Sequence, residues 1–185
     1  MNKDEKKIVN ITLKILSKKL WKNISVIEVR KKVNLKNELF DKIIKKKSDL
    51  LKILNRYFDY SLSLKIKTLE ISTEKDMMFE LLMMRFDILQ INRKSLLSIF
   101  NSYKINPMDL ITLFPIILDS IILMNKYAKI KDKGLNRQIK IKGYFLVYIL
   151  SFNSWTKDQS SSLEKTMMDL DSYLNQFDKI LKFLK

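Results

Sequence analysis

The residues best suited to chemistry are lysines that cluster in the first third of the chain. Residues 1–60 contain 17 Lys and Arg against 7 Asp and Glu, a surplus of +10, whereas residues 61–185 contain 19 against 13. Clustered ammonium groups attract phosphates, either of nucleic acid or of anionic lipid. The alternative is the codon bias of an AT-rich genome, which the single alanine indicates. A uniform bias would not concentrate the charge, so the charge map favours a phosphate-binding surface.

The residue types that the chain lacks exclude several other kinds of site. It contains no Cys, which excludes disulfides, thiolate nucleophiles, zinc fingers and iron–sulfur clusters. It contains no His, the commonest metal ligand and general base near neutral pH. Two glycines are too few for a phosphate-binding or dinucleotide-binding loop. We therefore expect a binding protein rather than an enzyme, with no catalytic residue, metal or cofactor.

The elements that position the lysines are predicted to be helices. Apolar residues recur at intervals of three and four, and two glycines and two prolines leave few breaks for a sheet protein. We expect an all-α fold of about nine helices. Helices are expected at about 4–20, 25–33, 36–43, 48–71, 73–91 and 93–103, then starting at Pro107, at Gly134 and after a capping segment at 158–160. Pro115 is expected to kink the seventh of these.

The first three helices are short and have local capping signals. Ser25 and Glu28 have the S-x-x-E spacing of a capping box, and Asn34 suits a left-handed turn. A helix, a short turn and a helix, braced by a preceding helix, form the helix-turn-helix pattern that places one helix in the major groove. A basic three-helix bundle without a DNA role has the same pattern. The candidate DNA contacts are Lys22, Ser25, Lys36, Asn37, Asp41, Lys42, Lys45, Lys46 and Lys47, with Lys31 as a further phosphate contact.

Residues 8–50 resemble the N-terminal domain of TetR-family regulators, at matching spacing and without a gap. The segment Trp21-Lys-Asn-Ile-Ser-Val26 is similar to the family's aromatic-x-x-[TV]-[ST]-[VM], and Lys47-Ser-Asp-Leu50 is similar to its K-[ED]-x-L. The other matching residues are Ile8, Val29, Leu35 and Phe40. The resemblance implies a TetR-like fold, double-stranded DNA as a partner and a homodimer. We expect a helix-turn-helix domain at 1–54 and a helical ligand-binding and dimerisation domain at 55–185.

The chain departs from the family pattern at several positions of the helix-turn-helix. Asn34 stands where the turn usually has Gly, and Lys36 replaces the usual Ser or Thr cap. Arg30 replaces a small residue that lets the helices pack closely. Asp41 replaces an aromatic residue, often Tyr, that touches DNA phosphate in the family, and phosphate repels a carboxylate. The remaining departures are Leu20, Val33 and Ile44.

Methionines and aromatic residues are frequent in the rest of the chain. Such residues line adaptable apolar cavities, and in TetR-like proteins a hydrophobic effector binds there. Plain core packing is the alternative. The candidate ligand-pocket residues are Phe79, Met83, Phe86, Phe114, Met124, Tyr148 and Trp155.

A second resemblance lies in Met83–Asp87, Trp155–Asp158 and Thr166–Leu170. These segments resemble alphaproteobacterial TetR-like proteins and, more weakly, the TetR-fold accessory proteins of ubiquinone biosynthesis. The first implies a DNA-binding transcriptional regulator, which is the leading interpretation. The second implies a protein that binds isoprenoid lipid and has a degenerate helix-turn-helix.

The last predicted helix has an unbroken heptad seam of apolar residues. The seam consists of Leu163, Met167, Leu170, Leu174, Phe177, Leu181 and Leu184. The family resemblance implies a dimer built as a four-helix bundle. The alternatives are packing against the chain's own preceding helix and an amphipathic helix on a membrane. No apolar run approaches the roughly 20 residues that span a bilayer, and we expect a cytoplasmic protein.

Overall fold

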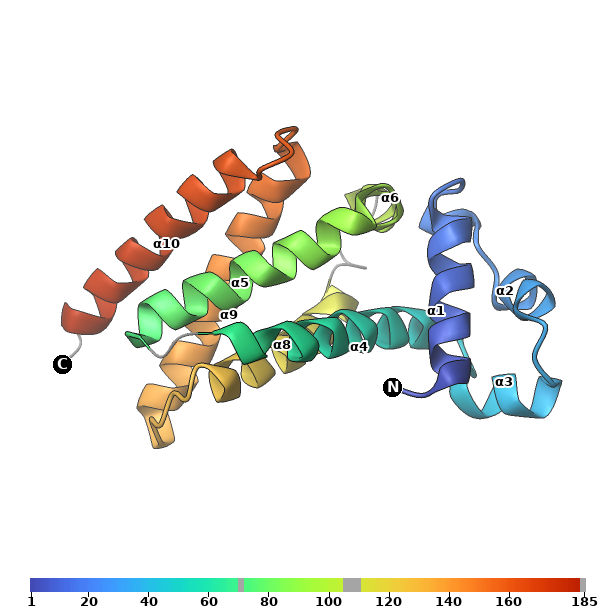
Figure 1. Ribbon diagram of the computed structural model, residues 1–185, viewed down its shortest axis with the longest axis horizontal. Coiled ribbons are helices and arrows are strands. Elements are labelled where there is room, and N and C mark those ends of the chain that lie inside the picture. Colours follow the sequence, from blue (N-terminus) through green and yellow to red (C-terminus); the bar gives the residue numbers. More distant parts are fainter. Residues whose placement is uncertain (70–71, 105–110, 184–185) are drawn as a thin grey trace. The chain divides into compact units, whose positions relative to one another are not determined.

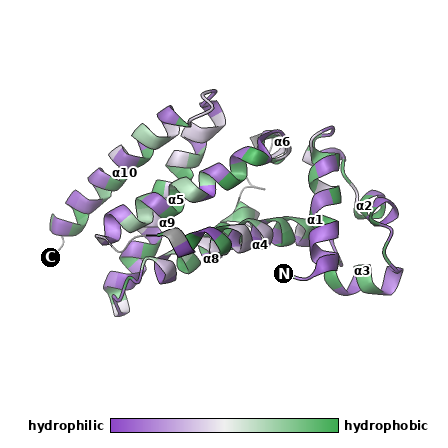
Figure 2. Cartoon of the chain, viewed as in Figure 1, coloured by the Kyte–Doolittle hydropathy of each residue, from purple (hydrophilic) through white to green (hydrophobic). Residues whose placement is uncertain are grey.

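The computed structural model describes residues 1–69, 72–104 and 111–183 (Figure 1). These residues form nine α-helices and three 3₁₀ turns, with no strand among them. The all-α fold class with about nine helices is confirmed, and it is consistent with a TetR-like fold. Helices such as α1 (Lys3–Leu16), α6 (Arg93–Lys104) and α10 (Glu164–Phe183) carry both hydrophobic and hydrophilic residues, as amphipathic helices do (Figure 2). None of the described helices is both long and apolar enough to cross a membrane.

The chain divides into two compact units. The first comprises Met1–Ser61 and Ile88–Ile116, and the second comprises Leu62–Asp87 and Ile117–Lys185. The first unit therefore includes a segment, 88–116, that the sequence analysis assigned to the C-terminal domain. The predicted boundary near residue 54 stays a prediction.

The first unit contains the helix-turn-helix. Its elements are α1 (Lys3–Leu16), η1 (Trp21–Asn23), α2 (Val26–Val33), α3 (Asn37–Ile43), the start of α4 (Lys47–Lys65), α6 (Arg93–Lys104) and η3 (Ile111–Leu113). The core side chains that are almost completely buried include Ile8, Leu16, Val29, Phe40, Ile44 and Leu50. Four of them, Ile8, Val29, Phe40 and Leu50, are among the residues that carry the family resemblance.

Three serines of α6, spaced by three and four residues, form hydrogen bonds with backbone groups of the helix-turn-helix region. The Ser95 hydroxyl donates to the Leu13 carbonyl at 2.8 Å, and the Ser98 hydroxyl donates to the Lys19 carbonyl at 2.6 Å. The Ser102 hydroxyl accepts the backbone N–H of Lys22 at 3.3 Å. These bonds satisfy backbone groups where α1 ends and η1 begins, which explains why α6 belongs to the first unit.

Two predicted boundaries in the first unit are wrong. The first helix ends at Leu16 rather than near residue 20, because the chain turns to bury Trp21 in η1. The fourth helix, for which the sequence predicts a start with Ser48 as the cap and an end near residue 71, instead begins at Lys47 and ends at Lys65, so Ser48 lies within its first turn. The Asp49 carboxylate instead accepts the backbone N–H groups of Lys45 at 3.1 Å and Lys46 at 3.0 Å. A carboxylate in the first turn can do this because the amides there are free.

The second unit contains the end of α4, η2 (Ile66–Thr68), most of α5 (Glu74–Ile91), most of α8 (Phe114–Tyr127), α9 (Gly134–Lys157) and α10 (Glu164–Phe183). Helices α9 and α10 pack against each other (Figure 1). The predicted starts of α5 and α9 are confirmed: Thr73 accepts the N–H of Asp76, and Gly134 begins α9 at φ +58°. The predicted kink at Pro115 is wrong, because α8 begins at Phe114 and the proline lies in its first turn. The predicted helix start at Pro107 lies outside the described residues.

The link between α9 and α10 is a buried carboxylate. Asp158 accepts the backbone N–H and the hydroxyl of Thr166, both at 2.8 Å, and the hydroxyl of Ser160 at 2.6 Å. Ser160 in turn accepts the N–H of Glu164, the first residue of α10, at 3.0 Å. The predicted capping role of residues 158–160 is therefore confirmed.

Candidate nucleic-acid interface

The turn between α2 and α3 is built from local sequence signals. The Ser25 hydroxyl accepts the N–H of Glu28 at 3.1 Å and caps α2. Asn34 ends α2 in the left-handed conformation, at φ 50° and ψ 52°. The Ser25 cap and the left-handed Asn34 match the sequence prediction, but the Glu28 half of the predicted capping box is not formed. The Glu28 carboxylate pairs with Lys19 at 2.8 Å and with Lys32 at 3.0 Å. Hydrogen bonds from these two lysines lower the pKa of Glu28.

Helix α3 presents nearly all of its side chains to solvent. Among its seven residues only Phe40 is buried, and Ile43 is half-buried. The exposed side chains are Asn37, Glu38, Leu39, Asp41 and Lys42. A short helix that anchors itself through one aromatic residue and exposes the rest has the form needed to enter a groove.

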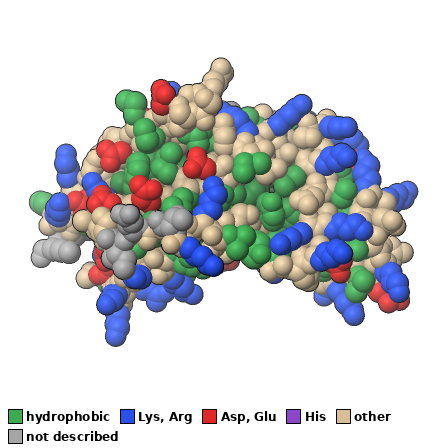
Figure 3. All heavy atoms as spheres, viewed as in Figure 1, with side chains coloured by type: hydrophobic (Ala, Val, Ile, Leu, Met, Phe, Trp, Pro, Cys, Tyr) green, Lys and Arg blue, Asp and Glu red, His purple; other side chains and the backbone are tan. Residues whose placement is uncertain are grey.

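Six lysines between residues 22 and 46 are available to an external anion. They are exposed and form no ion pair with any residue in the described part of the chain: Lys22, Lys31, Lys36, Lys42, Lys45 and Lys46. Blue Lys and Arg side chains are spread over the surface of the N-terminal helices in Figure 3. Five of these six lysines are DNA contacts predicted from the sequence, and the sixth, Lys31, is the predicted further phosphate contact.

Lys47 has a different environment from the other predicted contacts. Its ammonium nitrogen lies 4.7 Å from the centre of the Trp21 ring and donates to the Lys22 carbonyl at 3.2 Å. Burial lowers the pKa of Lys47. This lysine therefore joins the start of α4 to η1 through a cation–π contact. Lys47 therefore stabilises the structure beneath the predicted DNA-binding surface, and its ammonium group does not extend from that surface into solvent.

Asp41 is not the unpaired carboxylate that the sequence indicates. Its carboxylate forms an ion pair with the guanidinium of Arg30, which comes from α2. The same guanidinium lies 5.4 Å from the centre of the Phe40 ring. Both residues are departures from the family pattern, and nothing in their spacing of 11 residues predicts an ion pair between them.

The predicted ligand-pocket residues are mostly packed as core in the second unit. Phe86, Met124 and Trp155 are completely buried, and the Phe86 and Tyr148 rings stack at 5.6 Å. Phe79 and Met83 are half-buried. Phe114 belongs to the first unit and is 42% exposed. The contacts on these residues are those of core packing, and an effector pocket stays a prediction.

Arg85 is a buried residue of this core that the sequence analysis missed. Its guanidinium bonds to the Ser120 hydroxyl at 3.2 Å and to the Tyr148 hydroxyl at 3.5 Å. It stands between Met84 and Phe86 in a helix that is apolar on most sides. A charged residue amid such a run was the one signal available in the sequence.

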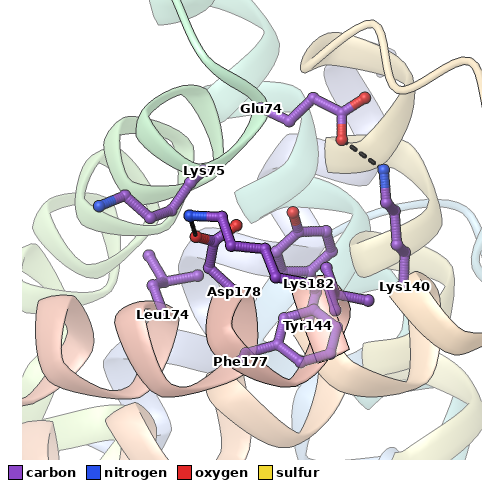
Figure 4. Close-up of a pocket in the computed structure, with 9 residues that line it drawn as sticks. Glu74, Lys75, Lys140, Tyr144, Leu174, Phe177, Asp178 and Lys182 are labelled. Carbon is purple, nitrogen blue, oxygen red and sulfur yellow. Dashed lines mark hydrogen bonds and ion pairs between the residues drawn. The ribbon is translucent and has the colours of Figure 1, made fainter. Parts of the chain in front are cut away.

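A small cavity lined by both charged and apolar side chains lies where α5, α9 and α10 meet (Figure 4). Its volume is about 100 Å³, well below the roughly 300 Å³ of the smallest usual ligand sites. The lining residues are Glu74, Lys75, Lys140, Tyr144, Leu174, Phe177, Asp178, Leu181 and Lys182. The cavity is therefore too small for an effector.

The buried ammonium of Lys140 bonds to the carboxylates of Glu74 and Asp132 beside this cavity (Figure 4 draws the bond to Glu74). Burial alone would lower the pKa of Lys140, but the bonds to Asp132 and Glu74 outweigh it and raise the pKa. Burial, with the nearby carboxylates, also raises the pKa of Tyr144. Both groups keep their protons at neutral pH, so neither is an activated nucleophile or base.

The heptad seam of α10 packs at least in part onto its own chain. Leu163, Leu170 and Leu174 are buried within the second unit. The Phe177 ring meets the Tyr144 ring edge-on at 5.1 Å, and Leu181 is half-buried. Met167 is 41% exposed. Leu184 lies outside the described residues. These contacts support the own-chain alternative for the seam, and a dimer through it stays a prediction.

The described residues contain no group of three or more acidic side chains placed to hold a metal ion. No protein-family model matches the chain, and no curated protein matches its sequence.

Proposed function

We propose that this chain is a DNA-binding transcriptional regulator of the TetR type. One observation carries the proposal: α3 exposes five of its seven residues, and six exposed lysines between residues 22 and 46 form no side-chain ion pair with the described residues. Lysines at the rim would bind phosphates and fix the register of the protein on the duplex. Side chains at the start of α3 would read bases in the major groove.

The exposed residues of α3 indicate which base edges it can read. The Asn37 amide can form two hydrogen bonds with adenine, and the Leu39 side chain can contact the methyl group of thymine. Glu38 can accept a hydrogen bond from the amino group of cytosine. A symmetric dimer would present two such helices about 34 Å apart, one turn of B-DNA.

Helix α6 provides a way in which a bound effector would change the affinity for DNA. Its three serines hold the backbone at the end of α1 and in η1. A hydrophobic ligand that favours a different position of α6 would therefore change the position of the helix-turn-helix and the affinity for DNA.

The test is selection of binding sites from random duplexes by the purified full chain, followed by affinity measurements over a range of salt concentrations. We expect a preferred sequence that binds at least about 10³-fold more tightly than unrelated DNA, with affinity that falls steeply with salt. Lys42→Ala and Lys46→Ala should each reduce the salt slope by about 1. The matched control is Lys179→Ala, an exposed lysine of α10, which should leave the slope unchanged. If no sequence is enriched, the regulator proposal is wrong.

A second candidate function is lipid binding by an accessory protein with the same fold. The observation in its favour is that Ile27, on α2, is 64% exposed and Leu39, on α3, is 40% exposed, both close in sequence to exposed lysines. Apolar side chains beside cations suit a surface of anionic lipid. Native mass spectrometry of the purified protein distinguishes the two functions, since a co-purified isoprenoid lipid or quinone supports the second.

A further inference from the structure

Helix α3 cannot hold its own orientation. It has seven residues, and its N-cap residue, Lys36, makes no side-chain capping bond. Isolated helices of this length are unstable in water, because the cost of nucleation is recovered only over more residues. The preceding turn is made by Asn34. The angle at which α3 projects must therefore be set by contacts with neighbouring helices.

One side chain from α2 contacts two successive residues of α3. The guanidinium of Arg30 pairs with the carboxylate of Asp41 and lies 5.4 Å from the ring centre of Phe40, the single buried residue of α3. The Arg30 Nε is buried and has no hydrogen-bond partner among the described residues. A buried donor is normally satisfied, because leaving it without a partner destabilises the fold. The contacts of the Arg30 guanidinium are therefore with Asp41 and Phe40 of α3, and its Nε adds no further hydrogen bond that would fix its position.

These two residues are both departures from the TetR pattern. A small residue at position 30 could not reach α3, and an aromatic residue at position 41 could not pair with a guanidinium. The two replacements therefore make structural sense together. We propose that Arg30 and Asp41 form a positioning pair that orients α3 for base contact, so that the Asp41 charge acts within the protein. This inference rests on the proposed DNA-binding function.

The positioning role predicts effects of opposite sign for two kinds of DNA. Removal of the Asp41 charge lowers the repulsion between protein and phosphate, so Asp41→Asn should bind unrelated DNA as tightly as the unmodified protein or more tightly. Loss of the pair should misplace α3, so affinity for the selected sequence should fall by about threefold or more. The ratio of the two affinities then falls, which a purely electrostatic effect would not produce.

Arg30→Met tests the other partner, with Lys31→Met as its matched control. Both variants remove one positive charge from adjacent positions of α2, but Lys31 has no partner among the described residues. Lys31→Met should weaken binding to selected and unrelated DNA by the same factor. Arg30→Met should weaken binding to the selected sequence by about threefold more than binding to unrelated DNA.

The exchanged double variant, Arg30→Asp with Asp41→Arg, is the rescue experiment. It should bring the affinity ratio back to within about twofold of the unmodified protein, because the pair is re-formed in reverse. All affinities are measured well below the unfolding temperature of each variant. If the unmodified protein prefers a sequence but Asp41→Asn tightens binding to both DNAs equally, the positioning pair is refuted and the regulator proposal stands. If no sequence is preferred, the regulator proposal itself fails.

Discussion

The lysines of the helix-turn-helix differ from one another at the scale of single residues. Lys46 is exposed and has no ion pair with the described residues, whereas the adjacent Lys47 lies over the Trp21 ring and bonds to a carbonyl. Sequence alone could not separate them, since both belong to one run of three lysines. The difference depends on where the ring of a residue 26 positions earlier is buried.

We predict that Lys47→Ala lowers the free energy of unfolding by about 1 kcal/mol, the usual range of a partly buried cation–π contact with a hydrogen bond. Lys46→Ala should change it by less than about 0.5 kcal/mol. Urea unfolding followed by circular dichroism measures both. Equal stabilities of the two variants would contradict a structural role for Lys47.

At the scale of elements, the capping signals were predictable and the contacts between helices were not. Ser25, Asn34, Thr73 and the 158–160 segment act on backbone groups within a few residues, so their spacing in the sequence was sufficient. The bonds of Lys140 to Glu74 join positions 66 residues apart. The spacing of the α6 serines likewise does not predict the backbone groups of Leu13, Lys19 and Lys22 to which they bond. Long-range polar contacts carry no periodic signal.

The cap of α10 should make stability depend on pH in the acid range. Burial alone would raise the pKa of Asp158, but its hydrogen bonds from Ser160 and Thr166 lower it to about 2. Because the folded-state pKa lies below the unfolded value, this stabilisation is complete above about pH 4 and is lost as pH falls towards 2. The shift corresponds to about 2 kcal/mol.

We predict that Asp158→Asn loses about that amount at pH 7 and has a flatter stability profile between pH 4 and pH 2. Asp169→Asn, within α10, is the control and should keep the acid profile of the unmodified protein. Chemical unfolding at a series of pH values measures the difference. A variant with the unmodified acid slope would show that Asp158 does not hold α10 in this way.

The contact between α9 and α10 requires a glycine within a helix. A methyl group at Gly143 would overlap the ring of Phe177. We predict that Gly143→Ala destabilises the protein by about 1–3 kcal/mol, although alanine is the better helix former by about 1 kcal/mol. With Phe177→Ala already present, the same change should become neutral or stabilising. Thermal unfolding of the four proteins in this cycle gives the coupling, and an additive cycle would rule out the overlap.

For the whole molecule, the sequence indicates where the positive charge lies but does not indicate how two chains would assemble. The surplus of +10 in residues 1–60 falls within the first unit, where six lysines between residues 22 and 46 are exposed. The heptad seam of the last helix does not indicate whether that helix packs against a partner chain or against its own chain, because both kinds of packing need the same apolar spacing. The structure buries Leu170 and Leu174 within one chain. A dimer would therefore need further apolar surface.

Such surface exists on the outer side of α9. Leu146 is 58% exposed, and Leu150, one helical turn away, is also exposed. Leu135, also exposed, lies 11 residues before Leu146, about three turns, and therefore on the same face. We predict a dimer at micromolar concentration, with Leu146→Lys shifting it towards monomer without unfolding it. Sedimentation velocity measures the assembly.

Two controls separate this face from the seam and from general surface effects. Leu170→Lys should unfold the protein instead of dissociating it, because that side chain is completely buried. Met168→Lys, an exposed residue of α10, should leave the dimer intact. If a dimer reads two half-sites, the monomeric Leu146→Lys protein should lose far more affinity for the selected sequence than for unrelated DNA, since only the former uses both copies of α3 at fixed spacing. An unmodified protein that sediments as a monomer at these concentrations would contradict the prediction, as would a Leu146→Lys protein that stays dimeric.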